Sequence, residues 1–87
     1  MKFQGSVIKE QGVTFAIVIV QRHIISNKSE ADKIIASFQR EIFGAMPIIL
    51  MAHDHHGTPI YYGRPDIVKF LASVPIQAIP WKEYSIS

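Results

Sequence analysis

The chain has 87 residues, which is enough for one domain spanning residues 1–87 with one modest core. It contains no cysteine, so disulfides, thiolate metal sites and thiol catalysis are excluded. Nine Lys and Arg residues against seven Asp and Glu residues give a formal charge of +2. Because the basic residues are spread singly along the chain, a nucleic-acid partner is not expected.

The composition is apolar for so short a chain. Hydrophobic residues make up 48% and charged residues 18%, compared with a usual charged share of about 25%. A small domain has much surface to cover, and this one has few charges to cover it with. We therefore expect part of the apolar surface to be buried against a second copy as a homodimer, although another protein partner would also fit.

The sequence predicts a cytoplasmic protein that does not enter membranes. The longest apolar run, residues 15–20, is far shorter than the roughly 18 residues that a membrane-spanning helix requires. Residues 1–6 are not followed by an apolar segment of the length that a signal peptide requires.

The first residues predict two strands joined by a tight turn. Residues 2–9 form the first expected strand, and Glu10-Gln11-Gly12 forms the turn, in which Gly12 can adopt a positive φ. Residues 13–20 are apolar and β-branched almost throughout. This composition favours a strand covered on both faces over a buried helix.

A helix is expected between Asn27 and Gly44. Asn27 can cap its first turn, with Glu30 three residues later, and Gly44 is placed to end it. Its apolar residues recur at helical spacing on one face. These residues are Ala31, Ile34, Ile35, Phe38 and Ile42.

The second half of the chain repeats the pattern of strand and helix. Residues 47–52 are apolar and predict a second interior strand, and residues 58–62 predict its hairpin partner. Residues 63–66 open a second helix, which Pro75 ends. Residues 76–84 are expected to be extended, and Pro80 confines them to the edge of a sheet or a bulge.

The predicted fold class is therefore α+β, a single small domain with elements in the order β-β-α-β-β-α-β and a mixed sheet of four to five strands. The helix between the two interior strands implies a right-handed crossover and a parallel pair. We expect the two helices to pack mainly on one face of the sheet, which leaves the other face for a second copy. The alternative is a shortened thioredoxin-like fold. It rests only on the order of the elements from Met46-Pro47 onward, which is a strand, a hairpin and a final helix.

The pentapeptide His53-Asp54-His55-His56-Gly57 is the first candidate site, because it holds three of the four histidines. Neutral imidazoles bind Zn²⁺ or another divalent metal, and a carboxylate such as Asp54 can complete the shell. If the interior strands are parallel, His23 lies at the same rim as His53 and His55, so these three are the predicted metal ligands. The simpler interpretation is a polar turn in which Asp54 and Gly57 serve the backbone.

The segment Tyr61-Tyr62-Gly63-Arg64 is the second candidate site. Alternation along a strand sends the two tyrosines to opposite faces. The start of the second helix, with Arg64 beside it, can hold an anion. The simpler interpretation is that Asp66 already fills that role. The hairpin places this segment and the histidine turn at opposite ends of its strands.

The sequence favours a non-enzymatic, self-associating binding or accessory module whose ligand it does not name. The competing interpretation is a small metal-binding or histidine-dependent enzyme with a site at residues 53–56, joined by His23. Imidazoles titrate near neutrality, but the sequence shows neither a pocket nor a positioned partner for acid–base catalysis. A third interpretation is a nucleic-acid binder that uses Arg22, Lys28, Arg64 and the tyrosines. No cofactor is expected apart from the divalent ion of the second interpretation.

Overall fold

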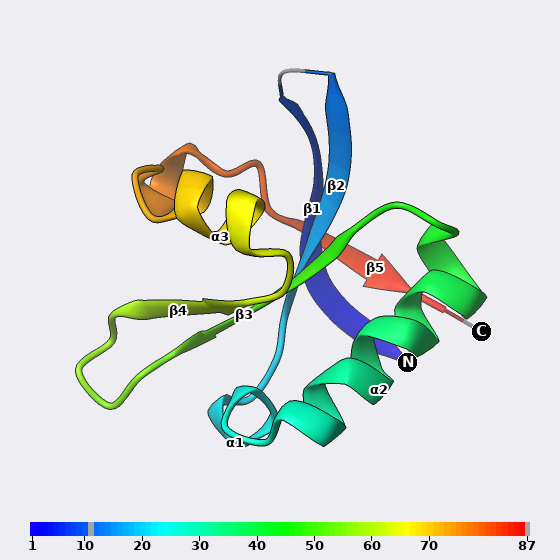
Figure 1. Ribbon diagram of the computed structural model, residues 1–87, viewed down its shortest axis with the longest axis horizontal. Helices are drawn as coiled ribbons and strands as arrows, with labels where there is room; N and C mark the ends of the chain where they lie inside the picture. The colour runs from blue at the N-terminus through cyan, green and yellow to red at the C-terminus, as the bar shows by residue number, and fades with distance from the viewer. Residues whose placement is uncertain (11, 87) are drawn as a thin grey trace.

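A five-stranded mixed sheet organises the computed structural model, which describes residues 1–10 and 12–86 (Figure 1). Its order across the sheet is β4-β3-β2-β1-β5. The strands are β1 (Lys2–Glu10), β2 (Val13–Ile19), β3 (Ile48–His53), β4 (Pro59–Tyr62) and β5 (Lys82–Ser85). Each predicted extended segment thus contains a strand, and the turn residue Gly12 has the expected positive φ of 78°. Gln11, also placed in that turn, lies outside the described residues.

The centre of the sheet is the predicted parallel pair. Strands β2 and β3 run parallel, in a register that pairs Ala16 with Ile48 and Ile19 with Met51. The neighbouring pairs β1–β2, β3–β4 and β1–β5 are antiparallel. The predicted α+β class with a mixed sheet is confirmed.

Helical segments connect the strands. They are α1 (Arg22–Ile25), α2 (Lys28–Phe38), the π-helical η1 (Gln39–Phe43), α3 (Pro65–Leu71) and the 3₁₀ turn η2 (Ile76–Ala78). Helix α2 begins as expected, because the Asn27 side chain accepts a hydrogen bond from the Glu30 N–H at 3.1 Å. Gly44 ends the helical stretch with a φ of 72°. Within the described part of the chain, no helix is long and apolar enough to cross a bilayer.

The expected position of the helices is wrong in one respect: α2 and α3 lie on opposite faces of the sheet (Figure 1). The face that packs on α2 is formed by Ala16, Val18, Ile48 and Leu50. The face that packs on α3 is formed by Phe15, Ile17, Ile49 and Met51. Side chains alternate along a strand, and here both alternating sets are apolar, so each face needs a cover of its own. A dimer therefore gains no support from an uncovered face of the central strands.

The last segment is less regular than predicted. Instead of one extended run, η2 precedes Pro80, and only β5 pairs with the sheet. Strand β5 lies at the edge, as Pro80 predicts, and covers β1 from Lys2 to Gly5. The Trp81 indole N–H donates to the Ile76 carbonyl within this segment at 3.2 Å, and the side chains of both residues pack against the core on the α3 side.

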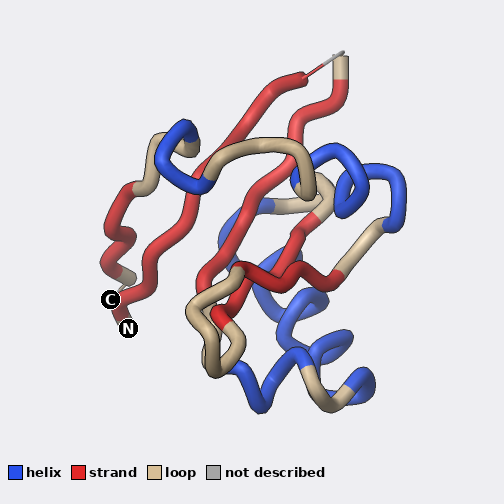
Figure 2. The backbone as a smooth tube through the Cα atoms, turned by 90° about the vertical axis from the view of Figure 1, so that its left-hand side faces the viewer, coloured by secondary structure: helices blue, strands red, loops and turns tan. Residues whose placement is uncertain are grey.

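Met1 and Ile86, the first and last residues that the structure describes, lie side by side, at the place where Figure 2 marks the N-terminus. The Met1 amino group donates to the Ile86 carbonyl, and the Ile86 N–H donates back to the Met1 carbonyl, both at 2.8 Å. Both ends thus lie at the β5 side of the sheet, and β4 forms its opposite edge.

Candidate binding site at the edge of strand β4

The histidine turn connects β3 to β4 and is organised by Asp54. One oxygen of the Asp54 carboxylate accepts the N–H groups of His56 and Thr58, both at 2.9 Å. The Asp54 N–H donates to the Thr58 carbonyl, also at 2.9 Å. Gly57 has a φ of 81°. These contacts are those of an Asx turn, so the backbone alone accounts for Asp54 and Gly57.

Both the turn itself and helix α1 affect the pKa of the Asp54 carboxyl. The Thr58 N–H, with that of His56, holds the pKa of the Asp54 carboxyl below its ordinary value. The positive charges of His55 and Arg22 act in the same direction. Arg22 belongs to α1, the helix that also carries His23.

The predicted zinc ligands are not assembled into a site. Among residues 1–10 and 12–86, no three His, Asp or Glu side chains are grouped so that they could hold a metal ion. The rings of His55 and His56 do lie close together, with centroids 4.0 Å apart. The structure holds no metal ion to test the zinc site of His23, His53 and His55, which stays a prediction.

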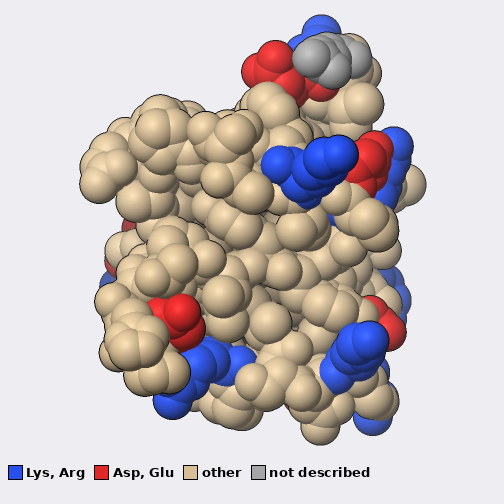
Figure 3. All heavy atoms as spheres, turned by 60° about the vertical axis from the view of Figure 1, so that its left-hand side comes forward, with Lys and Arg blue, Asp and Glu red and all other residues tan. Residues whose placement is uncertain are grey.

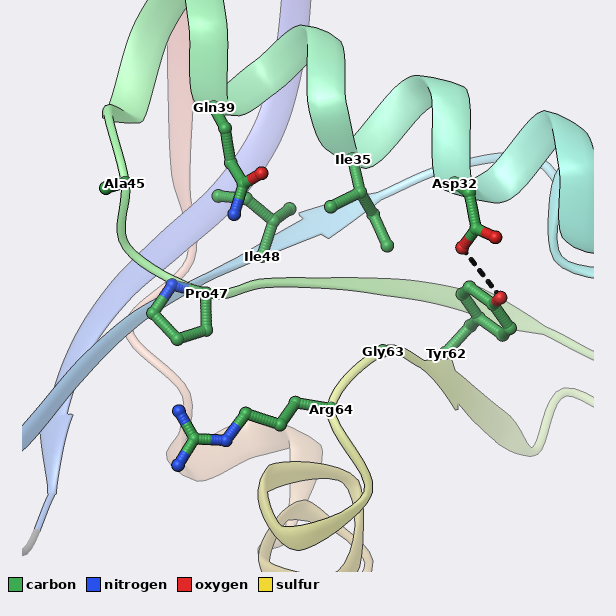
Figure 4. Close-up of a pocket in the computed structure, with 9 residues that line it drawn as sticks. All are labelled: Asp32, Ile35, Gln39, Ala45, Pro47, Ile48, Tyr62, Gly63 and Arg64. Atoms are coloured by element: carbon green, nitrogen blue, oxygen red, sulfur yellow. Dashed lines mark hydrogen bonds between the residues drawn. The ribbon is translucent and has the colours of Figure 1, made fainter.

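A hollow of about 430 Å³ lies on the α2 side of β4 (Figure 4). We call it the α2-side hollow. Helix α2 and η1 line it from one side, and the end of β4 with Arg64 lines it from the other. The lining residues are Asp32, Ile35, Gln39, Ala45, Pro47, Ile48, Tyr62, Gly63 and Arg64.

Each polar side chain in this hollow is held by a neighbour. The Tyr62 hydroxyl donates to an Asp32 carboxylate oxygen at 2.8 Å (Figure 4). The Gln39 side-chain amide donates to the Met46 carbonyl at 3.1 Å. The Arg64 Nε donates to Asp66 at 2.8 Å. The carboxylate of Asp32, the amide of Gln39 and the guanidinium of Arg64 each have further hydrogen-bonding atoms, so these side chains can still form hydrogen bonds with a ligand.

These hydrogen bonds shift two pKa values. The bond to Asp32 raises the pKa of the Tyr62 hydroxyl above its ordinary value, so the phenol stays protonated as a donor. The bond from Arg64 lowers the pKa of Asp66, which keeps that carboxylate charged. Asp66 thus takes up the Arg64 Nε, so a free anion site at Arg64, as the sequence suggested, is only partly available.

A second hollow, of about 350 Å³, lies on the other side of β4. We call it the α3-side hollow. Its lining contains no charged residue and is largely apolar: Thr58, Pro59, Tyr61, Leu71, Ala72, Val74, Pro75 and Ile76. Figure 3, in which the side of the molecule bearing the β3–β4 hairpin comes forward, shows charged side chains mostly at the margins of this face and an uncharged middle.

The outer edge of β4 lies between the two hollows. The bond from Asp54 to Thr58 directs Thr58 toward β3, and the register pairs Ile60 with Ala52 and Tyr62 with Leu50. Hydrogen-bonding direction alternates along an antiparallel strand, so the N–H and C=O of Tyr61 point away from β3. In the described chain no strand lies beyond β4, and no loop or helix backbone bonds to Tyr61.

Sequence reasoning found one half of this site. The segment Tyr61-Tyr62-Gly63-Arg64 was a candidate, and the two tyrosines do face opposite sides of the sheet, Tyr61 toward α3 and Tyr62 toward α2. Asp32 and Gln39 were missed. They lie seven residues apart, which places them on the same side of a helix, but nothing local to α2 indicates that β4 lies beside them.

The comparisons with known proteins give no assignment. No protein-family model matches this sequence, and neither a curated protein nor a solved structure matches it.

Proposed function

We propose that the protein is a non-enzymatic, self-associating binding module of the cytoplasm, and that the open edge of β4 is its binding surface. The observation that carries this proposal is the outward-facing N–H and C=O of Tyr61, on an edge strand with a hollow on each face. An edge of this kind can pair with an extended polypeptide segment.

Binding by strand addition explains why the two hollows matter together. In this mode the main chain supplies hydrogen bonds, and pockets on the two faces take alternate side chains of the added strand. The α3-side hollow suits an apolar side chain, because its lining is uncharged. The α2-side hollow suits either an apolar or a polar side chain, because Ile35 and Ile48 line it together with Asp32 and Arg64.

Charge also favours this edge over the other one. The segment from Thr58 to Gly63 carries no Lys, Arg, Asp or Glu. The opposite edge strand, β5, contains Lys82 and Glu83. Charged residues on an edge strand discourage pairing with other chains, so the two edges of this sheet differ in the property that controls strand addition.

The test is an NMR dilution series of the ¹⁵N-labelled protein. We expect the amide signals of Ile60, Tyr61 and Gly63 to move as the protein is diluted, together with those of the hollows, while those of Glu83 and Ser85 stay in place. A protein that sediments as a monomer at every concentration, with no moving signals, would refute self-association. Movement confined to β5 would refute the choice of edge.

A further inference from the structure

We infer that the segment added to the β4 edge is β4 of a second copy, running antiparallel about a two-fold axis that passes beside Tyr61. This inference rests on the proposed function and names its partner and its register. The resulting dimer joins two sheets into one continuous sheet with β4 strands at its centre.

Backbone chemistry selects this register. With Tyr61 opposite the partner's Tyr61, each Tyr61 N–H donates to the other Tyr61 carbonyl. Two residues further along, Gly63 N–H faces the partner's Pro59 carbonyl, which gives about four hydrogen bonds in all. Moving the register so that Pro59 faces the partner's Tyr61 removes about half of these bonds, because proline has no N–H.

A shift in the other direction fails for a different reason. It places Pro59 opposite the partner's Pro65, where the chain has left the sheet and helix α3 has begun. Only the register centred on Tyr61 keeps all of β4 beside extended backbone. Pro59 therefore disfavours the shifted registers, but it does not prevent another strand from pairing with this edge.

The side chains fit a second copy without charge conflict. Alternation keeps each side chain on its own face, so Tyr61 meets the partner's Tyr61 on the α3 side. Ile60 meets the partner's Tyr62 on the α2 side. Every residue of β4 is uncharged and only partly buried, so two copies can approach without like-charge repulsion and each can bury further surface.

The absence of cysteine makes the register directly testable. Across a hydrogen-bonded antiparallel pair the Cα atoms are about 5.5 Å apart, a separation at which a disulfide can form. We expect Tyr61→Cys to form a disulfide-linked dimer on mild oxidation about tenfold faster than two matched controls. The controls are Thr58→Cys, which lies about 20 Å from its own copy in this register, and Ser85→Cys on the opposite edge. Equal or faster linkage of either control would overturn the inference.

A second measurement uses the unchanged chain, since Tyr61 packs on the core and its replacement can weaken folding. In the proposed register Ile60 and the partner's Tyr62 form a pair without mutual hydrogen bonds, whose Cα atoms are about 4.5 Å apart. An isotope-filtered NOE experiment on mixed labelled and unlabelled protein should show contact between their Hα atoms. A dimer without this contact would overturn the register and leave the proposed function standing, whereas a strict monomer would refute both.

Discussion

Single residues decide where this backbone can bend and how close its layers can come. Gly63 is the clearest case. It directly follows β4, with a φ of 153°, and a Cβ atom built there would lie 2.6 Å from the Ile49 side chain and 3.0 Å from the Ile48 carbonyl oxygen. The chain thus leaves the sheet for α3 at a point where an added side chain would press against the Ile48 carbonyl and displace the end of the Ile49 side chain.

We predict that Gly63→Ala lowers the free energy of unfolding by about 2–4 kcal/mol, because backbone strain adds to overpacking against β3. Urea denaturation measures the change. Gly57→Ala is the matched control: its φ is also positive, but no atom lies within 4 Å of the added Cβ, so only the strain of about 1–2 kcal/mol remains. Equal losses in the two variants would show that the close contact at Gly63 has no effect.

The carboxyl of Asp54 makes the histidine turn sensitive to acid. Its pKa is lower in the folded chain than its ordinary value of 3.8. A group whose pKa is lowered by folding stabilises the fold above its unfolded pKa, and this stabilisation is lost as the pH falls through the folded pKa. The contribution of Asp54 is therefore complete at neutral pH and disappears below about pH 4.

We predict that Asp54→Asn keeps most of the turn, because an amide oxygen can still accept the N–H groups of His56 and Thr58. It should remove the share of acid sensitivity that Asp54 supplies. Denaturation curves between neutral pH and pH 3 check this. Asp54→Ala should lose the turn at both pH values, and an unchanged acid profile in both variants would contradict the assignment.

At the scale of elements, the sequence predicted the strands and helices that have a clear hydrophobic period or a distinctive residue composition. The strand at residues 13–20 was predictable because these residues are apolar and β-branched almost throughout, and the strand at residues 47–52 because its six residues are all apolar. Helix α2 was predictable because its apolar residues recur at helical spacing. Helix α1 has only four residues, which is too few to show a period. The faces of α2 and α3 were not predictable, because strands apolar on both sides do not indicate which helix covers which.

Pairing between elements also limits what a sequence reveals about the site. Tyr62, Gly63 and Arg64 are consecutive and were found as a group. Asp32 reaches Tyr62 only through the packing of α2 on the sheet, across 30 positions of the chain. The predicted contribution of His23 has the same character, since it depends on how α1 sits against the turn.

We predict that His23→Ala leaves the affinity for Zn²⁺ unchanged, because α1 and the turn do not form a three-ligand group in the described residues. Zinc titration followed by the imidazole NMR signals measures this. Only the signals of His55 and His56 should move substantially, since their rings are adjacent. A large loss of affinity in the variant, with the signals of His23 and His53 moving together when zinc is added to the unchanged protein, would support the predicted metal site.

For the whole molecule, the expectation of self-association now rests on different grounds. In the sequence, this expectation rested on the apolar composition and on a face of the sheet that was expected to lack a helix. Both central faces are covered by helices, so composition and the uncharged β4 edge remain. A partner is therefore expected beside the edge strand β4, where it adds strands to the sheet, and not on either face of the sheet.

We predict that self-association depends weakly on salt, because no charged side chain belongs to β4. Between low and high salt the dissociation constant should change by less than about twofold, since screening acts on interactions between charges. Sedimentation equilibrium at several salt concentrations checks this. Strong weakening by salt would indicate a charged interface, such as one through β5.

The neighbouring chain ends have a mechanical consequence. Strands β1 and β5 are antiparallel, so β1 begins at the corner of the sheet where β5 ends. At this corner Met1 and Ile86 form hydrogen bonds with each other. A force that pulls these ends apart loads the bonds between the two strands in succession, starting at that corner, and not all at once. The chain should therefore unzip from there at low force, with the layer around β3 and β4 opening last.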